Sequence, residues 1–226
     1  MSKSFTRLAV MAIAATVAAG PALAEGEWSA NVALTSDYKF RGISQTDGAP
    51  MVSGGFDWAS DSFYVGTWAS GVDFGDGTST EIDIYAGFTP TVGVFDLDIG
   101  AIYYLYPDAP DEPEQNFVEL YAGGSTTVGE FLDIGASIAY SPEFYYETGQ
   151  AFYYALSAGV PLGESFGLDA TLGYSAGDED EGFVDYTDYS VGLTTSAEGF
   201  DFDLRYVGTD LDDDDGSIIF TIARAM

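Results

Sequence analysis

Segments of about ten residues, in which apolar side chains alternate with small or polar ones, recur along this chain with short and long connections in turn. Residues 95–100 read Phe-Asp-Leu-Asp-Ile-Gly, and residues 200–205 read Phe-Asp-Phe-Asp-Leu-Arg. A period of two indicates a β-strand whose two faces meet different surroundings. An even number of such strands, joined by short and long connections in turn, predicts an all-β fold, a transmembrane antiparallel up-and-down β-barrel.

Twelve strands can be placed along the chain, at residues 28–38, 51–59, 62–72, 80–89, 94–106, 116–126, 131–140, 150–160, 166–175, 187–196, 200–208 and 217–225. The connections after even-numbered strands are short, as at 60–61, and those after odd-numbered strands are long and polar, as at 107–115. Outer-membrane barrels have short periplasmic turns and long outer loops, so both ends of the barrel are expected on the periplasmic side. A soluble β-sandwich is the alternative, but one face of these strands is rich in glycine, serine and aspartate, which would make a poor sandwich core.

Residues 1–24 are predicted to be a cleaved signal peptide, and residues 25–226 to be the barrel. Lys3 and Arg7 precede an apolar run at 8–17, and Ala22 and Ala24 supply small residues for cleavage. That run is shorter than a membrane-spanning helix requires, and no later run is long enough. Export followed by barrel insertion predicts a location in the bacterial outer membrane.

The charge balance is strongly acidic, with 37 acids against 6 bases in the whole chain. Binding of nucleic acid through its phosphates needs basic patches, and the sequence has none. The bases beyond the signal segment are Lys39, Arg41, Arg205 and Arg224. Lys39 and Arg41 flank the first long loop, and their plainest role is to pair with lumen or loop acids, with lipopolysaccharide phosphates as the alternative.

Alternate residues of each strand form one apolar and one polar face, and the polar face carries most of the candidate functional residues. If the apolar face meets lipid, the polar face meets the lumen. The residues expected to line the pore and set its selectivity are Asp96, Asp98, Asp133, Asp169, Asp201 and Asp203, with Arg205 as counter-charge, and Glu81, Asp83 and Glu119 nearer the outer end. Carboxylates around a wet channel attract cations. Because Arg205 is the only obvious inward base, the acids cannot all be paired, so either water is expected to reach them or several of them are expected to be protonated.

Aromatic residues near strand ends are expected to form interfacial girdles at headgroup depth. They are Trp28, Tyr38, Trp58, Trp68, Tyr103, Tyr106, Tyr140, Tyr174 and Tyr206.

The sequence offers little for catalysis or for firm metal binding. It has neither histidine nor cysteine, which excludes Ser-His-Asp chemistry and sites built from imidazole or thiolate ligands. Paired carboxylates such as Asp96 and Asp98 are better explained as lumen charges than as an acid–base pair. The acidic loop 210–216 lacks the EF-hand glycine and terminal glutamate, so a solvated loop is the plainer interpretation and loose binding of divalent cations the alternative. We therefore predict no enzyme activity, no cofactor and no dedicated metal site.

Six motifs in the first two thirds of the chain resemble those of the TorF family of porins. Residues 35–46 read TSDYKFRGISQT, and the match continues through 64–74, 81–87, 103–107, 117–123 and 140–144. The resemblance implies an outer-membrane barrel of Gram-negative bacteria with porin activity. It implies no particular substrate and no catalytic residue.

These observations predict a porin-like channel for passive diffusion of small solutes, with a preference for cations. The alternative is a closed structural or surface-binding barrel whose acidic loops contact partners or divalent cations. The expected partners of the channel are outer-membrane lipid, lipopolysaccharide and small solutes or cations, and no interface in the sequence predicts an oligomeric state.

Overall fold

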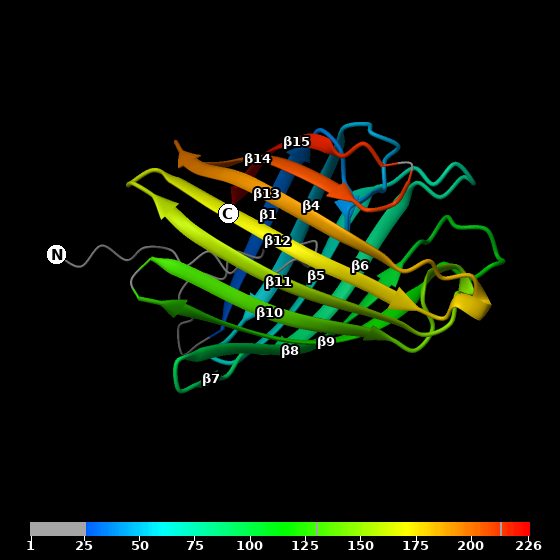
Figure 1. The fold of residues 1–226 in the computed structure, drawn as a ribbon, viewed down its shortest axis with the longest axis horizontal. Coiled ribbons are helices and arrows are strands. Elements are labelled where there is room, and N and C mark those ends of the chain that lie inside the picture. The colour runs from blue at the N-terminus through cyan, green and yellow to red at the C-terminus, as the bar shows by residue number, and fades with distance from the viewer. Residues whose placement is uncertain (1–25, 130, 213) are drawn as a thin grey trace.

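The computed structural model describes residues 26–129, 131–212 and 214–226, so the predicted signal peptide lies outside the described residues. The predicted fold is confirmed, because twelve long strands form a closed antiparallel β-barrel (Figure 1). These strands are β1 (Glu27–Thr35), β4 (Met51–Ala59), β5 (Phe63–Gly71), β6 (Thr80–Phe88), β8 (Phe95–Leu105), β9 (Phe117–Val128), β10 (Leu132–Ser141), β11 (Ala151–Leu162), β12 (Phe166–Gly177), β13 (Tyr186–Ala197), β14 (Phe200–Thr209) and β15 (Ser217–Ala225). Short elements in the connections are β2 (Lys39–Phe40), β3 (Ile43–Ser44), β7 (Thr91–Val92) and the 3₁₀ turns η1 (Tyr145–Glu147) and η2 (Glu179–Glu181).

Each long strand pairs with its neighbours in sequence, and one further pairing, of β1 with β15, completes the circle. The order runs β6-β5-β4-β1-β15-β14-β13-β12-β11-β10-β9-β8, and β8 pairs with β6. The first strand, β1, closes on the last strand, β15, where Ala30 and Met226 exchange backbone hydrogen bonds of 3.1 and 2.8 Å. A closed barrel leaves no long sheet edge unpaired.

The two ends of the barrel differ in their connections, as predicted. Short turns gather at one end, on the left in Figure 1, and the long loops gather at the other. Between β13 and β14 only Glu198 and Gly199 turn the chain, with φ of 55° and 78°. Two consecutive residues with positive φ make the type I′ turn that suits a two-residue hairpin.

The outward face of the strands is apolar and exposed. Val52, Ile99 and Leu172 have relative exposures of 61%, 50% and 52%, although each is a large hydrophobic residue. Strands of 9–12 residues match the length of a strand that crosses a bilayer. Burial of this face in lipid accounts for its composition. No helix among the described residues is long and apolar enough to cross a membrane.

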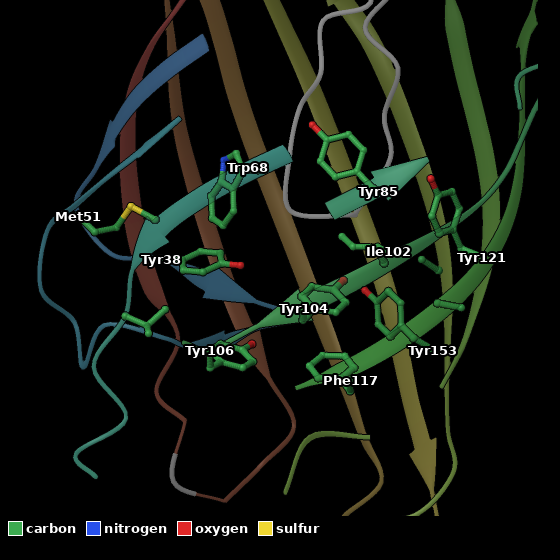
Figure 2. Packing of buried hydrophobic residues seen from close by; sticks show 13 residues of the cluster. Tyr38, Met51, Trp68, Tyr85, Ile102, Tyr104, Tyr106, Phe117, Tyr121 and Tyr153 are labelled. Carbon is green, nitrogen blue, oxygen red and sulfur yellow. The ribbon is translucent and has the colours of Figure 1, made fainter. Parts of the chain in front are cut away.

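A cluster of inward-facing aromatic side chains fills part of the lumen (Figure 2). It includes Tyr85 on β6, Tyr104 on β8, Phe117 on β9 and Tyr153 on β11. Tyr104 and Phe117 stack with ring centroids 4.3 Å apart. Such rings bury large areas while their hydroxyls find polar partners.

The girdle prediction is wrong for three of its aromatic residues. Tyr38, Trp68 and Tyr106 are 6%, 7% and 5% exposed and belong to the lumen cluster. Trp68 shares the parity of the buried Ser70, so its face was fixed by strand alternation rather than by its place near a strand end. Trp28 and Tyr103 do lie on the outer face, with exposures of 65% and 42%.

Candidate functional site

The first long loop, residues 36–50, folds into the barrel rather than away from it. We call it the inward loop. The hydroxyl of Tyr38 donates to Glu81 on β6 over 2.8 Å, and a Cβ on Gly42 would meet Thr209 on β14 and Asp188 on β13. Because β6 and β13 lie on opposite sides of β1 in the strand order, the inward loop crosses the lumen.

Arg41 lies at the tip of the inward loop and reaches the far wall. Its Nη2 donates to both carboxylate oxygens of Glu119 on β9, each over 2.8 Å. Its guanidinium carbon lies 4.1 Å from the ring centroid of Tyr153 on β11 and 4.6 Å from that of Phe40. The Arg41 and Glu119 side chains are only 7% and 4% exposed, so this pair is an interior one. The expected pairing of the two loop bases is confirmed, since Lys39 also lies 3.5 Å from Asp37.

The three outer acids of the predicted site are enclosed in this packing. Glu81, Asp83 and Glu119 are 2%, 1% and 3% exposed, so of the two alternatives given for the unpaired acids, access of water does not hold for these three in this conformation. Glu81 accepts hydrogen bonds of 2.8 Å from the hydroxyls of Tyr38 and Tyr106. The prediction assumed that the long loops stay outside the barrel, whereas the inward loop packs against these acids.

Burial of inward side chains extends around the whole outer half of the barrel. Tyr104, Ser175 and Val207 face inward from β8, β12 and β14 with exposures of 1%, 2% and 7%. Several inward residues nearer the short turns keep partial exposure, among them Asp98, Asp133, Thr171 and Ser190, whereas Asp57 and Asp169 in that half are 3% and 7% exposed. The lumen is therefore packed more tightly in its outer half, and we call the half towards the short turns the inner vestibule.

The six vestibule acids of the predicted site follow the short turns. Each is the second or fourth residue of its strand: Asp96 and Asp98 on β8, Asp133 on β10, Asp169 on β12, and Asp201 and Asp203 on β14. Most accept a hydrogen bond from a neighbouring hydroxyl. Tyr64 donates to Asp98 over 2.9 Å, Thr127 to Asp133 over 2.6 Å and Ser196 to Asp201 over 2.5 Å. These bonds leave further lone pairs of each carboxylate for water or a solute.

Arg205 on β14 ties two of these acids together. Its Nη1 and Nη2 meet the oxygens of Asp169 over 2.6 and 3.1 Å, and Nη2 also meets Asp203 over 2.8 Å. The guanidinium crosses β13 above Gly192, where a Cβ would collide with it. The glycine therefore makes the contact between two non-adjacent strands possible.

The strand register brings some predicted residues together and separates others. Asp133 and Asp169 belong to one row of facing residues that passes through Gly159 and continues through Gly192 to Arg205. Asp98 faces Gly123, and its row continues to Asp188 on β13. The register thus places Asp133, Asp169 and Arg205 in a common row that does not include Asp98.

Sequence reasoning did not assign a role to Asp188, which helps to shape the lumen. Asp188 on β13 is 6% exposed and accepts a 3.2 Å hydrogen bond from Tyr153. Strand parity was the available signal for this acid. The position of Arg41 depends on a partner 78 residues away, for which the sequence carries no periodic signal.

Two loop acids hold the long connections together outside the strands. Asp76 accepts from the backbone of Thr78 over 2.9 Å, from Tyr146 over 2.7 Å and from Gln115 over 2.6 Å. These hydrogen bonds hold the pKa of Asp76 well below its usual range. Hydrogen bonds from Ser79 likewise lower the pKa of Asp108. Loop carboxylates thus stabilise the loops that cover the packed half.

The acids of loop 210–216 are used in a similar way. Asp214 accepts from the backbone nitrogen of Gly216 over 2.9 Å and from that of Thr209 over 2.5 Å, and Asp210 accepts from that of Thr187 over 2.7 Å. In the part of the chain that the structure describes, no group of three or more acids has the geometry to hold a metal ion.

Comparisons with known proteins place this geometry among bacterial barrels. A family model described as "Bacterial protein of unknown function (Gcw_chp)" matches residues 18–225. The TorF resemblance stays a prediction, since the matching model carries another name. No curated protein matches the chain.

Two solved structures share the fold over most of their length. A KdgM porin in complex with disordered oligogalacturonate has a TM-score of 0.61 at 8% identity, covering 88% of this chain and 96% of its own. The COG4313 outer membrane channel from Pseudomonas putida F1 has a TM-score of 0.60 at 10% identity, covering 91% and 97%. At such identities the likeness shows the barrel fold, and function has to be argued from the lumen.

Proposed function

We propose that this chain, which belongs to the Gcw_chp family of bacterial proteins of unknown function, is an outer-membrane channel for passive diffusion of small solutes that prefers cations. One observation carries the proposal: a closed barrel with an apolar outer face has a vestibule lined by six aspartates and one arginine. An interior of this kind would be a poor soluble core, and it suits a hydrated passage.

The fold supports an outer-membrane location. Both similar structures are outer-membrane barrels or porins by their descriptions, and the exposed apolar band of this chain needs lipid to cover it. The short turns would then face the periplasm, and the inner vestibule would open there.

The charges support a preference for cations. The vestibule acids outnumber their base, and the chain as a whole carries a formal net charge of −31. Fixed carboxylates along a narrow aqueous path raise the local concentration of cations and repel anions. The oligogalacturonate named with the KdgM porin is an acidic sugar polymer, so a ligand of that charge does not suit this lumen.

The residues give no support to catalysis. The chain has no histidine, and the vestibule aspartates are hydrogen-bonded to hydroxyls or to Arg205 rather than arranged around a nucleophile. We infer a transport role without covalent chemistry.

A second candidate function is a closed barrel that acts through its loops. The burial of Tyr104, Glu119 and Ser175 in the outer half favours it, since packed side chains there oppose passage of a solute in this conformation. A channel requires the inward loop to move aside at least part of the time.

Conductance across planar bilayers distinguishes the channel from the closed barrel. The full barrel is refolded from detergent into the bilayer, with a tenfold KCl gradient across it. If the protein is a channel, we expect discrete conductance steps and a reversal potential with the sign of a cation-selective pore. Absence of steps from protein shown to be inserted supports the closed barrel, and an anion-side potential contradicts the cation preference.

A further inference from the structure

The outer lumen already contains a cation, supplied by the chain itself. One nitrogen of Arg41, Nη2, lies between both oxygens of Glu119 at 2.8 Å. The charged group also lies over the ring of Tyr153 at 4.1 Å. A carboxylate beside an aromatic face is a general recognition arrangement for organic cations.

The walls of this arrangement are held in place without Arg41. Tyr104 donates to Glu119 over 3.1 Å, and Tyr153 donates to Asp188 over 3.2 Å. Glu119, Tyr153 and Asp188 come from β9, β11 and β13, whose ladders are continuous with the rest of the barrel. The receptor groups are therefore set on rigid strands, whereas their present occupant sits on a loop.

More carboxyl groups are enclosed here than Arg41 can pair with. Asp83, only 1% exposed, has no hydrogen-bond partner for either carboxylate oxygen among the described residues. Asp83 faces Tyr104 across the β6–β8 ladder, and Tyr104 is the residue that donates to Glu119. Oδ2 of Asp188 is also buried without a partner in the described part of the chain. Enclosed carboxyl groups in this number are stable when some are protonated or when a second positive group pairs with them.

Arg41 is joined to the barrel wall through contacts of its side chain. The tip of the inward loop turns through Arg41 and Gly42, with φ of 48° and 86°. A positive φ is unfavourable for arginine, so this turn costs energy that the contacts with Glu119 and Tyr153 offset. A solute that makes the same contacts with Glu119 and Tyr153 would remove the interactions of Arg41 that offset this cost.

We propose that the site formed by Glu119, Tyr153 and Asp188 recognises guanidinium and primary alkylammonium solutes, and that Arg41 is a tethered competitor for it. Either cation can place one nitrogen between the two oxygens of Glu119, as Arg41 Nη2 does. Entry of the solute displaces the inward loop and opens the packed half. The assignment rests on the proposed channel function for its physiological meaning, and the site itself can be tested separately.

The tether sets the expected affinities. A group on a short flexible linker competes at an effective concentration of about 1 mM or more. Free methylguanidinium should therefore bind the unaltered barrel weakly and bind Arg41→Ala at least tenfold more tightly. Removing the carboxylate as well, in Arg41→Ala/Glu119→Gln, should weaken binding by at least tenfold again.

Calorimetric titration of the refolded full barrel in detergent micelles measures these affinities. The probes are methylguanidinium and methylammonium, with neutral methylurea as the matched control for size. Strand content by circular dichroism checks each variant, and Arg41→Gln serves if Arg41→Ala does not fold. Saturable binding of both cations to the Arg41 variant, lost with Glu119→Gln and absent for methylurea, supports the site. Equal binding to folded barrels with and without Glu119, or none to the folded Arg41 variant, overturns it.

Bilayer recordings on the same Arg41 variant separate this site from the channel proposal. Binding in micelles together with no current leaves the site in place and contradicts the channel. Current together with no cation binding leaves the channel in place and contradicts the site. Millimolar methylguanidinium that interrupts the potassium current of Arg41→Ala, and not that of Arg41→Ala/Glu119→Gln, supports both.

Discussion

Replacement of Arg205 by methionine tests the electrostatic organisation of the vestibule. Arg205 bridges Asp169 and Asp203 through contacts of 2.6, 3.1 and 2.8 Å. Methionine keeps an unbranched stem and removes the charge, so Asp169 and Asp203 lose their counter-charge. The substitution therefore separates the contribution of the charged bridge from that of the packing of the side-chain stem.

The magnitude follows from the exposure of the three side chains. Loss of one partner from a fully buried pair costs about 3–5 kcal/mol, and a fully exposed pair contributes about 0–1 kcal/mol. The side chains of Arg205 and Asp203 are 25% and 24% exposed, and that of Asp169 is 8% exposed. Arg205→Met should therefore lower the free energy of unfolding by about 1.5–3 kcal/mol.

Urea titration of the barrel in lipid vesicles measures this difference. Arg205→Lys is the matched control, because it keeps the charge and loses the planar fork, and it should cost about half as much. Neutralising the acids as well, in Arg205→Met/Asp169→Asn/Asp203→Asn, should restore most of the loss, because no unpaired charge then remains. A loss below about 0.5 kcal/mol for Arg205→Met, or a triple variant no more stable than the single one, would refute the reasoning.

Three further outcomes follow from the structure. Replacing four vestibule aspartates by asparagine should move the reversal potential towards zero in a KCl gradient, and an unchanged potential would reject their role in selectivity; the four are Asp98, Asp133, Asp169 and Asp203. Gly42→Ala should raise the open fraction in bilayers several-fold, because its Cβ would collide with Thr209 and strain a residue at φ of 86°; an unaltered open fraction would contradict a gating role for the inward loop. The folded-state pKa of Asp76 is lowered, so its loop contacts persist above the unfolded-state pKa of about 3.9 and are lost as pH falls through the still lower folded-state pKa. Hydrogen exchange of residues 72–79, corrected for intrinsic rates, should therefore rise only below about pH 4. A rise already between pH 7 and 5 would contradict this prediction.

The strands could be predicted because their alternation is imposed locally by two different surroundings. Leu97, Asp98 and Ile99 show this directly, since every second residue must suit lipid and the next must suit the lumen. The same parity fixes the inward direction of Asp98, Asp169 and Asp203. Turn residues and loop lengths then give the order and the two ends of the barrel.

The packed half could not be predicted in the same way, because it depends on contacts between distant residues. Arg41 meets a carboxylate 78 positions away, and Tyr38 meets one 43 positions away. Neither contact follows a period, and both require a loop to fold inward against solvation of its polar groups. The parity of Trp68 was available in the sequence, and it was overridden by the expectation that aromatic residues near strand ends face the membrane.

Site-directed spin labelling at two adjacent positions tests the central claim, that apolar side chains coat the outside of the barrel and acids line a hydrated interior. The chain has no cysteine, so Asp98→Cys and Ile99→Cys each give a single labelled site. In vesicles, we expect the label at 99 to be relaxed by dissolved oxygen, which concentrates in lipid, and the label at 98 by a water-soluble nickel complex. The opposite accessibilities at these two positions would contradict the account.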